Sequence, residues 1–191
     1  HGFKLGLQMM LGLPEDTPDR SLLTGDALIA IEPDMVRIYP TLVVKETGLE
    51  ERYTKGTYTP FDLETTINLC AQLTERFEQA GITVLRIGLQ TTEQIQIGKD
   101  VIAGPHHPAL GQLVDEKRWM TFILTFIKDM TAPITIEASS KLYQTLVGHK
   151  KAHLDIWASH KPPVQIGLNK EVPDNVLKIN EEYVHRFEHR I

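Results

Sequence analysis

Short apolar runs alternate with amphipathic runs between residues 3 and 87, and this order constrains the fold more than any other feature of the sequence. Residues 3–11, 35–39 and 82–87 are apolar stretches of strand length, nearly continuous as in parallel sheets. Residues 18–31 and 63–80 separate them and are expected to be helices, the second with apolar residues at helical spacing. Because buried strands joined by helices form right-handed βαβ units, the sequence predicts an α/β fold with a parallel sheet.

The two expected helices carry recognisable end signals. Thr17 can cap the first helix, Pro18 suits its first turn, and Pro33 prevents its continuation. Gly81 is a natural stop for the second helix. The apolar face of that second helix consists of Leu63, Ile67, Cys70, Leu73 and Phe77. Cys70 is therefore expected to be a small core residue and not a catalytic thiol.

The composition is that of an ordinary globular protein and excludes several classes. Of the 191 residues, 41% are hydrophobic and 24% are charged, which suits one domain or two small ones. The single cysteine excludes a disulfide framework within the chain and predicts a reducing, cytoplasmic location. No apolar run approaches the roughly 18 residues of a membrane helix, so no membrane association is expected. The net charge of -5 disfavours a general polyanion binder.

The chain begins at His1-Gly2 without an initiator methionine and enters a strand-like run at Phe3. A natural N-terminus seldom lies inside a strand, so we expect that an N-terminal part of the same polypeptide precedes this fragment. The first strand should then lie at an exposed edge of the sheet. Because exposed edges promote association, an oligomer formed through this edge is a further expectation.

The pattern changes in the second half of the chain. Residues 88–108 have no clear period and form a long loop, which in a compact domain is usually functional. Residues 109–130 have the pattern of one long helix, and a small α+β unit is expected from residue 131. Its expected elements are strands at 134–136, 164–168 and 176–179, with the last two paired as a hairpin, and helices at 141–147 and 152–159. The predicted domains are therefore 1–130 and 131–191.

The most specific motif follows the second apolar run. Residues 39–51 read Tyr-Pro-Thr-Leu-Val-Val-Lys-Glu-Thr-Gly-Leu-Glu-Glu, and Gly56-Thr57-Tyr58 comes shortly after. This resembles the catalytic subunit of Elongator and its bacterial radical-SAM relatives, in which a strand ending in Tyr-Pro leads into such a stretch and a Gly-x-Tyr turn. Residues 8–14, Gln-Met-Met-Leu-Gly-Leu-Pro, resemble the fifth barrel strand of these families, although Glu15 replaces their usual glycine. The resemblance covers residues 3–60 well and extends loosely to about 114.

The resemblance implies a partial (β/α) radical-SAM barrel that binds S-adenosylmethionine at the C-terminal ends of its strands. Members of the family hold a 4Fe-4S cluster through three cysteines in one loop, and Cys70 alone cannot supply three thiolates. The parent chain is thus expected to be a radical-SAM enzyme acting on tRNA or a small molecule. The fragment alone should be inactive and should not fully bind either cofactor. The acetyltransferase domain of the Elongator subunit is expected to be absent, since the sequence has no pyrophosphate loop of that kind.

The strand ends supply the candidate cofactor residues implied by the resemblance. Gln8, Met9, Arg37 and Tyr39 are expected nearest to S-adenosylmethionine. Gln8 can hydrogen-bond a carboxylate, a ribose or an adenine edge, whereas Met9 and Tyr39 can pack on adenine or be ordinary core residues. Arg37 lies in an apolar strand and needs a partner if buried, which could be a carboxylate of a ligand or of the protein.

A second group of candidates lies on the substrate side of the barrel. Lys45, Arg86, Gln90 and His106 are assigned to it. Arg86 repeats the device of a charged residue in an apolar strand followed by a polar loop. His106 could contact an anionic substrate or be a plain loop histidine. Adjacent residues of an extended chain point in opposite directions, so His106 and His107 are not expected to share a metal ion.

The turn Gly148-His149-Lys150-Lys151 lies between the two short helices of the tail. This arrangement resembles the KH module, whose Gly-x-x-Gly loop clamps a nucleic-acid backbone, although Lys151 replaces the second glycine. Gly148, Lys150 and Lys151 are therefore candidate nucleic-acid contacts, and tRNA is a candidate partner. The alternatives are a solvated turn in a small packing domain, and a fragment that binds RNA or acts as a scaffold without catalysis.

Overall fold

The structure, a computed structural model, describes residues 2–89, 99–148 and 151–186, and it divides the chain into two compact units. The first unit is His1–Val114 and the second is Asp115–Ile191, so the boundary lies within helix α4 (Leu110–Ile127). We expected the boundary near residue 130. It lies earlier because Trp119, Ile123 and Ile127 belong to the hydrophobic core of the second unit.

The first unit is built on a parallel sheet of the order β1-β2-β4. The strands are β1 (Gly6–Leu11), β2 (Met35–Pro40) and β4 (Thr83–Ile87). Both pairings are parallel, as the alternating strand and helix pattern predicted. In the described part of the chain, β1 is an edge strand, which confirms that expectation, and β4 forms the other edge.

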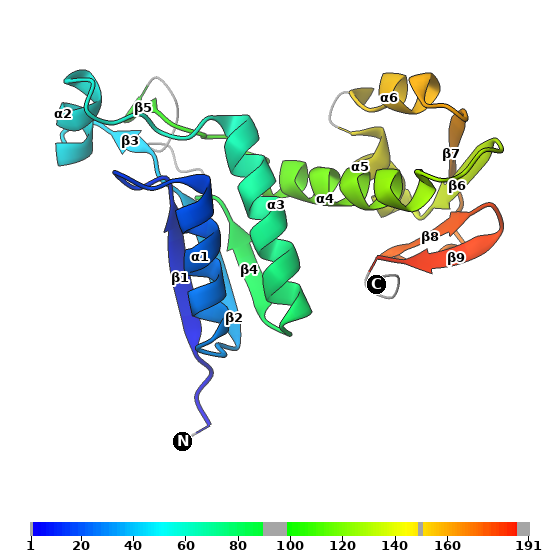
Figure 1. The fold of residues 1–191 in the computed structure, drawn as a ribbon, viewed down its shortest axis with the longest axis horizontal. Coiled ribbons are helices and arrows are strands. Elements are labelled where there is room, and N and C mark those ends of the chain that lie inside the picture. The colour runs from blue at the N-terminus through cyan, green and yellow to red at the C-terminus, as the bar shows by residue number, and fades with distance from the viewer. Residues whose placement is uncertain (1, 90–98, 149–150, 187–191) are drawn as a thin grey trace. The chain divides into compact units, whose positions relative to one another are not determined.

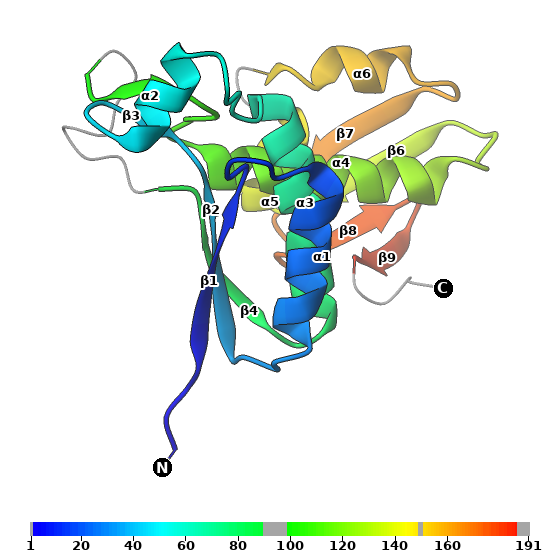
Figure 2. The same ribbon diagram turned by 60° about the vertical axis from the view of Figure 1, so that its left-hand side comes forward.

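Helices α1 (Pro18–Ile29) and α3 (Leu63–Gln79) cover one face of this sheet (Figures 1 and 2). Thr17 caps α1 by accepting a 3.2 Å hydrogen bond from the Arg20 amide, as the sequence predicted. The two helices touch at Gly25, where an added Cβ would collide with Leu73 Cδ2 of α3. An alanine at this position would therefore displace the Leu73 side chain.

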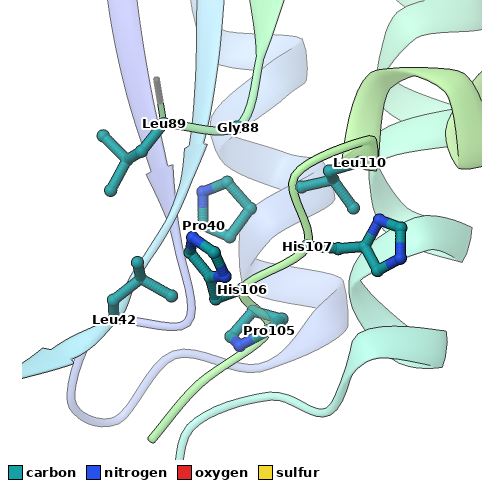
Figure 3. Close-up of a pocket in the computed structure, with 8 residues that line it drawn as sticks. All are labelled: Pro40, Leu42, Gly88, Leu89, Pro105, His106, His107 and Leu110. Carbon is teal, nitrogen blue, oxygen red and sulfur yellow. The ribbon is translucent and has the colours of Figure 1, made fainter. Parts of the chain in front are cut away.

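The connections after β2 and β4 are joined to each other at the C-terminal end of the sheet. Strand β3 (Val43–Val44) pairs antiparallel with β5 (Val101–Ala103), and helix α2 (Gly48–Thr54) follows β3. After β5 the chain returns to the end of β2, where Pro105 and Pro40 line one small pocket (Figure 3). The sequence did not predict β3 or β5, because strands of two or three residues have no periodicity to detect.

The second unit is a mixed sheet with helices, in the strand order β7-β6-β8-β9. Its elements are β6 (Ile134–Ala138), α5 (Ser140–Val147), α6 (Leu154–Ser159), β7 (Val164–Leu168), β8 (Val176–Ile179) and β9 (Glu182–His185). The predicted hairpin between β7 and β8 is wrong. Strand β7 instead pairs parallel with β6, and β8 pairs antiparallel with both β6 and β9.

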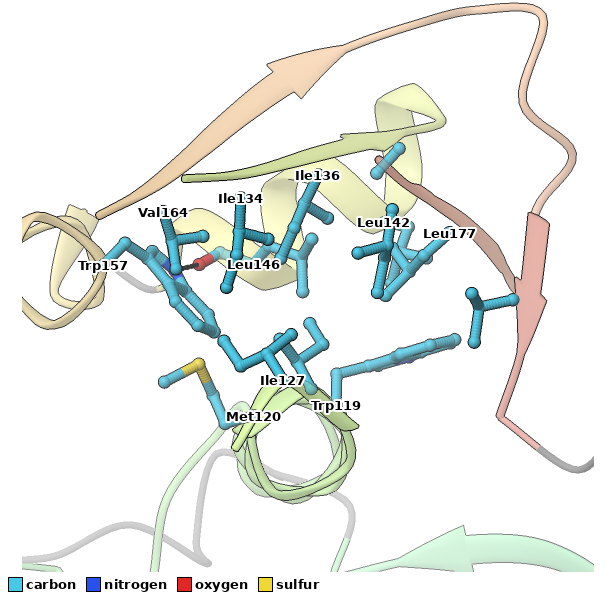
Figure 4. Packing of buried hydrophobic residues seen from close by; sticks show 14 residues of the cluster. Trp119, Met120, Ile127, Ile134, Ile136, Leu142, Leu146, Trp157, Val164 and Leu177 are labelled. Atoms are coloured by element: carbon cyan, nitrogen blue, oxygen red, sulfur yellow. Dashed lines mark hydrogen bonds between the residues drawn. The ribbon is translucent and has the colours of Figure 1, made fainter. Parts of the chain in front are cut away.

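The core of the second unit lies between this sheet and helix α4 (Figure 4). Trp119, Met120 and Ile127 of the helix belong to one buried cluster with Ile134 and Ile136 of β6. Trp157 of α6 closes one end of the core and donates a 2.9 Å hydrogen bond from Nε1 to the Leu146 carbonyl. The indole thus buries its ring without leaving its polar N–H unpaired. Among the described residues, no helix is both long and apolar enough to cross a membrane.

Candidate functional site

The open face of the parallel sheet lies opposite α1 and α3 (Figure 2). It carries four of the candidate side chains, namely Gln8, Arg37, Tyr39 and Arg86. Side chains alternate between the two faces of a strand, so neighbours in the sequence have different surroundings. Met9 is 3% exposed and packs in the helix-covered core, whereas Met10 is 48% exposed on the open face. We expected Met9 near the cofactor, and the structure instead places Met10 on the accessible side. The core alternative therefore describes Met9.

Gln8, Arg37 and Arg86 form one row across the open face. Gln8 of β1 is in register with Arg37 of β2, and Arg37 is in register with Arg86 of β4. All three residues are exposed. Neighbouring strands lie about 4.8 Å apart, so these side chains start from adjacent positions. The structure thus brings together two residues assigned to the cofactor and one assigned to the substrate.

A bulge in β4 places Arg86 beside Arg37 in this row. Val36 pairs with Val84, but the next residue of β2, Arg37, pairs with Arg86, so Leu85 is the extra residue. Bulges re-aim side chains and are frequent beside active sites. Because the shift cannot be read from apolar periodicity, the sequence showed that Arg86 interrupts a strand but not that it lies beside Arg37.

Tyr39 follows Arg37 by two residues and is half-buried in register with Met10. It therefore shares the open face with Arg37. A methionine and a tyrosine on neighbouring strands form a surface on which a flat ring can pack.

Arg37 makes no ion pair or side-chain hydrogen bond with any residue that the structure describes.

The loop after β1 is fixed by two side chains that the sequence did not single out for this role. Asp16 accepts hydrogen bonds from the Gly12 amide (2.8 Å), the Thr17 amide (2.8 Å) and Ser21 Oγ (2.7 Å). Tyr58 donates its hydroxyl to the Gly12 carbonyl. Burial, and then the negative charge of Asp16, raise the pKa of Tyr58. Both peptide groups of Gly12 are thus held, which fixes the end of the strand that carries Gln8 and Met10.

The turn with two histidines lies at the C-terminal end of β2 and β4. His106 and His107 point in different directions (Figure 3), as adjacent residues of an extended chain do. His107 Nδ1 accepts a 3.1 Å hydrogen bond from the Ala109 amide, in the turn just before α4. His106 lines a pocket with Pro40, Leu42 and Pro105, and the volume of that pocket, about 10 Å³, is that of roughly one water. Of the two histidines, His106 is the one that remains a candidate for substrate contact.

Two of the remaining substrate-side candidates do not join the row. Lys45 is exposed directly after β3, and its amide donates to the Asp100 carbonyl at 2.8 Å. Gln90 lies outside the described residues.

Gly104 leads into the histidine turn and has a φ of 117°. It packs so closely that an added Cβ would lie 3.0 Å from the Thr41 carbonyl oxygen.

The nucleic-acid candidates lie in the second unit. Gly148 caps α5 with a φ of 78°, and an added Cβ would lie 2.7 Å from His153 Nδ1. Lys151 is exposed, whereas Lys150 lies outside the described residues. The full turn, and with it the KH resemblance, thus remains a prediction.

The residues present fit one of the two cofactors that a radical-SAM enzyme needs. The open face offers a guanidinium, a side-chain amide and an apolar surface, which match the carboxylate, polar groups and adenine of S-adenosylmethionine. Cys70 does not fit a cluster ligand, because it is fully buried and burial raises its pKa to about 12. In the part of the chain that the structure describes, no three His, Cys, Asp or Glu residues gather to hold a metal ion.

Part of the chain is similar to known proteins. Residues 33–119 match the family model described as Radical_SAM C-terminal domain. An uncharacterized protein of Methanocaldococcus jannaschii is 38% identical over 74 residues, which are 39% of this chain and 23% of that protein. The tRNA uridine(34) acetyltransferase of Dehalococcoides mccartyi is 33% identical over 76 residues, 38% of this chain and 17% of the enzyme.

A solved structure with the same fold is the archaeal Methanocaldococcus infernus Elp3 with an N-terminus deletion. It matches with a TM-score of 0.55 and 24% identity, over 63% of this chain and 28% of that chain. The chain therefore spans less than a third of the length of each of these relatives.

Proposed function

From the premise that this chain contains an Elongator-like radical-SAM C-terminal region, we propose that it forms the later strands of a (β/α) barrel in a radical-SAM enzyme. The observation that carries the proposal is the parallel sheet with one helix-covered face and one open face bearing Gln8, Arg37 and Arg86. In such barrels the helices lie outside and ligands meet the C-terminal ends of the strands. Thiolates from another part of the polypeptide would hold the cluster.

Three side chains of the open face have distinct roles in the proposed site. Arg37 would hold the carboxylate of S-adenosylmethionine through paired hydrogen bonds. Gln8 would bind a polar edge of the ribose or adenine, and Tyr39, together with Met10, would pack against the adenine ring. When bound in a complete enzyme, this cofactor supplies hydrogen-abstraction chemistry. The chain contributes binding, orientation and exclusion of water.

The substrate class in this proposal is tRNA or a small molecule that reaches the same face. The relative from Dehalococcoides mccartyi is named for tRNA uridine(34), which supports the first possibility. Arg86, His106 and Lys45 are the residues assigned to that side.

The test is the formation of 5′-deoxyadenosine by the full-length protein after anaerobic reconstitution and reduction. We expect Gln8→Ala to raise the KM for S-adenosylmethionine about tenfold, since a hydrogen bond to a charged or polar ligand group is lost. Gln72→Ala is the matched control, because Gln72 is exposed on helix α3 and away from the open face. No 5′-deoxyadenosine from the wild-type protein, or equal KM values for Gln8→Ala and wild type, would refute the proposal.

A second candidate function is an RNA-binding or scaffolding piece without catalysis. Exposed lysines in the second unit favour it, namely Lys141, Lys151 and Lys161. Phosphate contacts through such lysines would give affinity without an active site. RNA binding by a full-length protein that forms no 5′-deoxyadenosine would favour this candidate.

A further inference from the structure

We propose that strand β7 of the second unit is a docking edge for a second copy of this chain, with the two β7 strands paired antiparallel about a two-fold axis. The two copies would then share one continuous sheet across the interface. The inference goes beyond the proposed function, because it concerns the second unit and does not depend on the chemistry of the open face. It also uses a different edge from β1, at which the sequence suggested association.

Strand β7 is an edge strand in the part of the chain that the structure describes. It reads Val-Gln-Ile-Gly-Leu, without a charged residue or a proline, whereas the opposite edge strand, β9, carries Glu182. Its pairing with β6 is regular and has no bulge. Proteins usually protect an exposed edge with charges, prolines or bulges. Strand β7 therefore lacks the features that prevent an edge from pairing with another chain.

The hydrogen bonds to β6 define which groups of β7 point outward. The Ile134 amide donates to the Pro163 carbonyl at 3.0 Å, and the Asn169 amide donates to the Ala138 carbonyl at 2.9 Å. Because the peptide groups of successive residues face opposite sides of a strand, those of every second residue in β7 point away from β6. The outward-facing residues are therefore Val164, Ile166 and Leu168.

One antiparallel register uses all of these outward groups. The amide and carbonyl groups of the three outward-facing residues have no hydrogen-bond partner among the described residues. A two-fold axis at Ile166 pairs Ile166 with its own copy, and it pairs Val164 with Leu168 of the second copy. In an antiparallel ladder each of these pairs exchanges two hydrogen bonds. The outer edge of β7 is thus complementary to itself.

The same register brings opposite charges together beyond the ends of the strand. Lys161 is opposite Glu171 of the second copy, because both lie five residues from Ile166. Both side chains are exposed, and neither has an ion-pair partner in the described part of the chain. Lys170, another charged residue next to the strand, is opposite Pro162. The two equivalent Lys161–Glu171 pairs favour a second copy of this chain over an unrelated strand.

Apolar side chains gather beside this edge. Leu168 of β7 is 50% exposed, and Leu154 and Ile156 of helix α6, which packs next to β7, are 39% and 42% exposed. Paired residues of an antiparallel ladder have their side chains on the same face, so Leu168 of the second copy would lie beside the buried Val164. Pairing would therefore remove apolar surface from water as well as complete the edge.

The test is the oligomeric state of the full-length protein, measured by sedimentation equilibrium over a series of concentrations. We expect a monomer–dimer equilibrium for wild type and a dimer Kd at least about tenfold larger for Leu168→Lys, because this variant places a charge beside Val164 of the second copy. Tyr183→Lys is the matched control, since it replaces an exposed side chain on the opposite edge strand. It should leave the dimer Kd within about twofold of wild type.

Reversal of the flanking charges tests the register. We expect Lys161→Glu and Glu171→Lys each to raise the dimer Kd about threefold to tenfold, since opposite-charge pairs become like-charge pairs. The double variant should return the Kd to within about twofold of wild type, because it restores the opposite charges. Circular dichroism of each variant checks folding. The rescue changes no residue of β7, so it decides the question even if Leu168→Lys fails to fold.

A wild-type protein that stays monomeric at every concentration would overturn the inference. A dimer that Leu168→Lys leaves unchanged, or that Tyr183→Lys weakens equally, would also overturn it, because the interface would then lie elsewhere. Unchanged Kd values in both charge-reversal variants would contradict the register. None of these results alters the test of 5′-deoxyadenosine formation, so the two proposals can fail separately.

Discussion

Tyr58 shows how one side chain far along the chain can fix the site. It lies 46 residues after Gly12, and it is 7% exposed while its hydroxyl donates to the Gly12 carbonyl. Asp16 holds the amide of the same glycine. The Gly-x-Tyr motif was visible in the sequence as part of a family resemblance. The sequence did not show the physical role of this tyrosine. The structure shows that its hydroxyl holds the loop after β1.

We predict that Tyr58→Phe lowers the free energy of unfolding by about 1 kcal/mol near pH 8, because a buried hydrogen bond is lost. Since the folded-state pKa of Tyr58 is raised above its ordinary value of 10.0, wild type also loses the contribution of Tyr58 as the pH rises above 10. The difference between the two proteins should therefore narrow at pH 11. Urea unfolding at both pH values measures it. Tyr53→Phe, at an exposed tyrosine, is the control, and an equal loss there would contradict the prediction.

The elements of the parallel sheet were predictable, because long apolar runs and clear helix caps determine them locally. The sequence placed the three strands and two helices of this layer, and the cap at Thr17 is present as expected. Strands β3, β5 and β9 were missed, and β7 was wrongly paired with β8. These short strands depend on long-range pairing, as when Val43 meets Ala103, which no local pattern encodes.

A substitution at Gly25 tests how closely helices α1 and α3 approach each other. We predict that Gly25→Ala destabilises the protein by about 1–3 kcal/mol, since its methyl group would displace Leu73 in the core. Gly48→Ala, where the new methyl group meets open space, should change stability by no more than about 0.5–1 kcal/mol. Thermal unfolding followed by circular dichroism compares them. If Gly25→Ala were as stable as wild type, the described contact would be incorrect.

The second unit carries the candidate residues for RNA contact. If the second unit binds RNA, Lys150→Glu with Lys151→Glu should weaken binding of tRNA by the full-length protein, most strongly at low salt, because fewer counterions are released. The slope of log affinity against log salt should fall by roughly one per lysine. Lys128→Glu with Lys170→Glu, elsewhere in the unit, is the matched control. Equal slopes for wild type and for the variant with both lysines replaced would contradict RNA contact through Lys150 and Lys151. The unit would then be interpreted as a packing domain.

We propose that the open face of the parallel sheet holds S-adenosylmethionine. Photocrosslinking tests this most directly, because it identifies the residues that lie beside the bound cofactor. The full-length protein would be irradiated with 8-azido-S-adenosylmethionine and the modified peptides identified by mass spectrometry, with excess S-adenosylhomocysteine as the competitor. We predict competed labelling within residues 6–11 or 35–40, where Met10 and Tyr39 lie on neighbouring strands. Competed labelling confined to residues 115–191, or to helices α1 and α3, would contradict the claim.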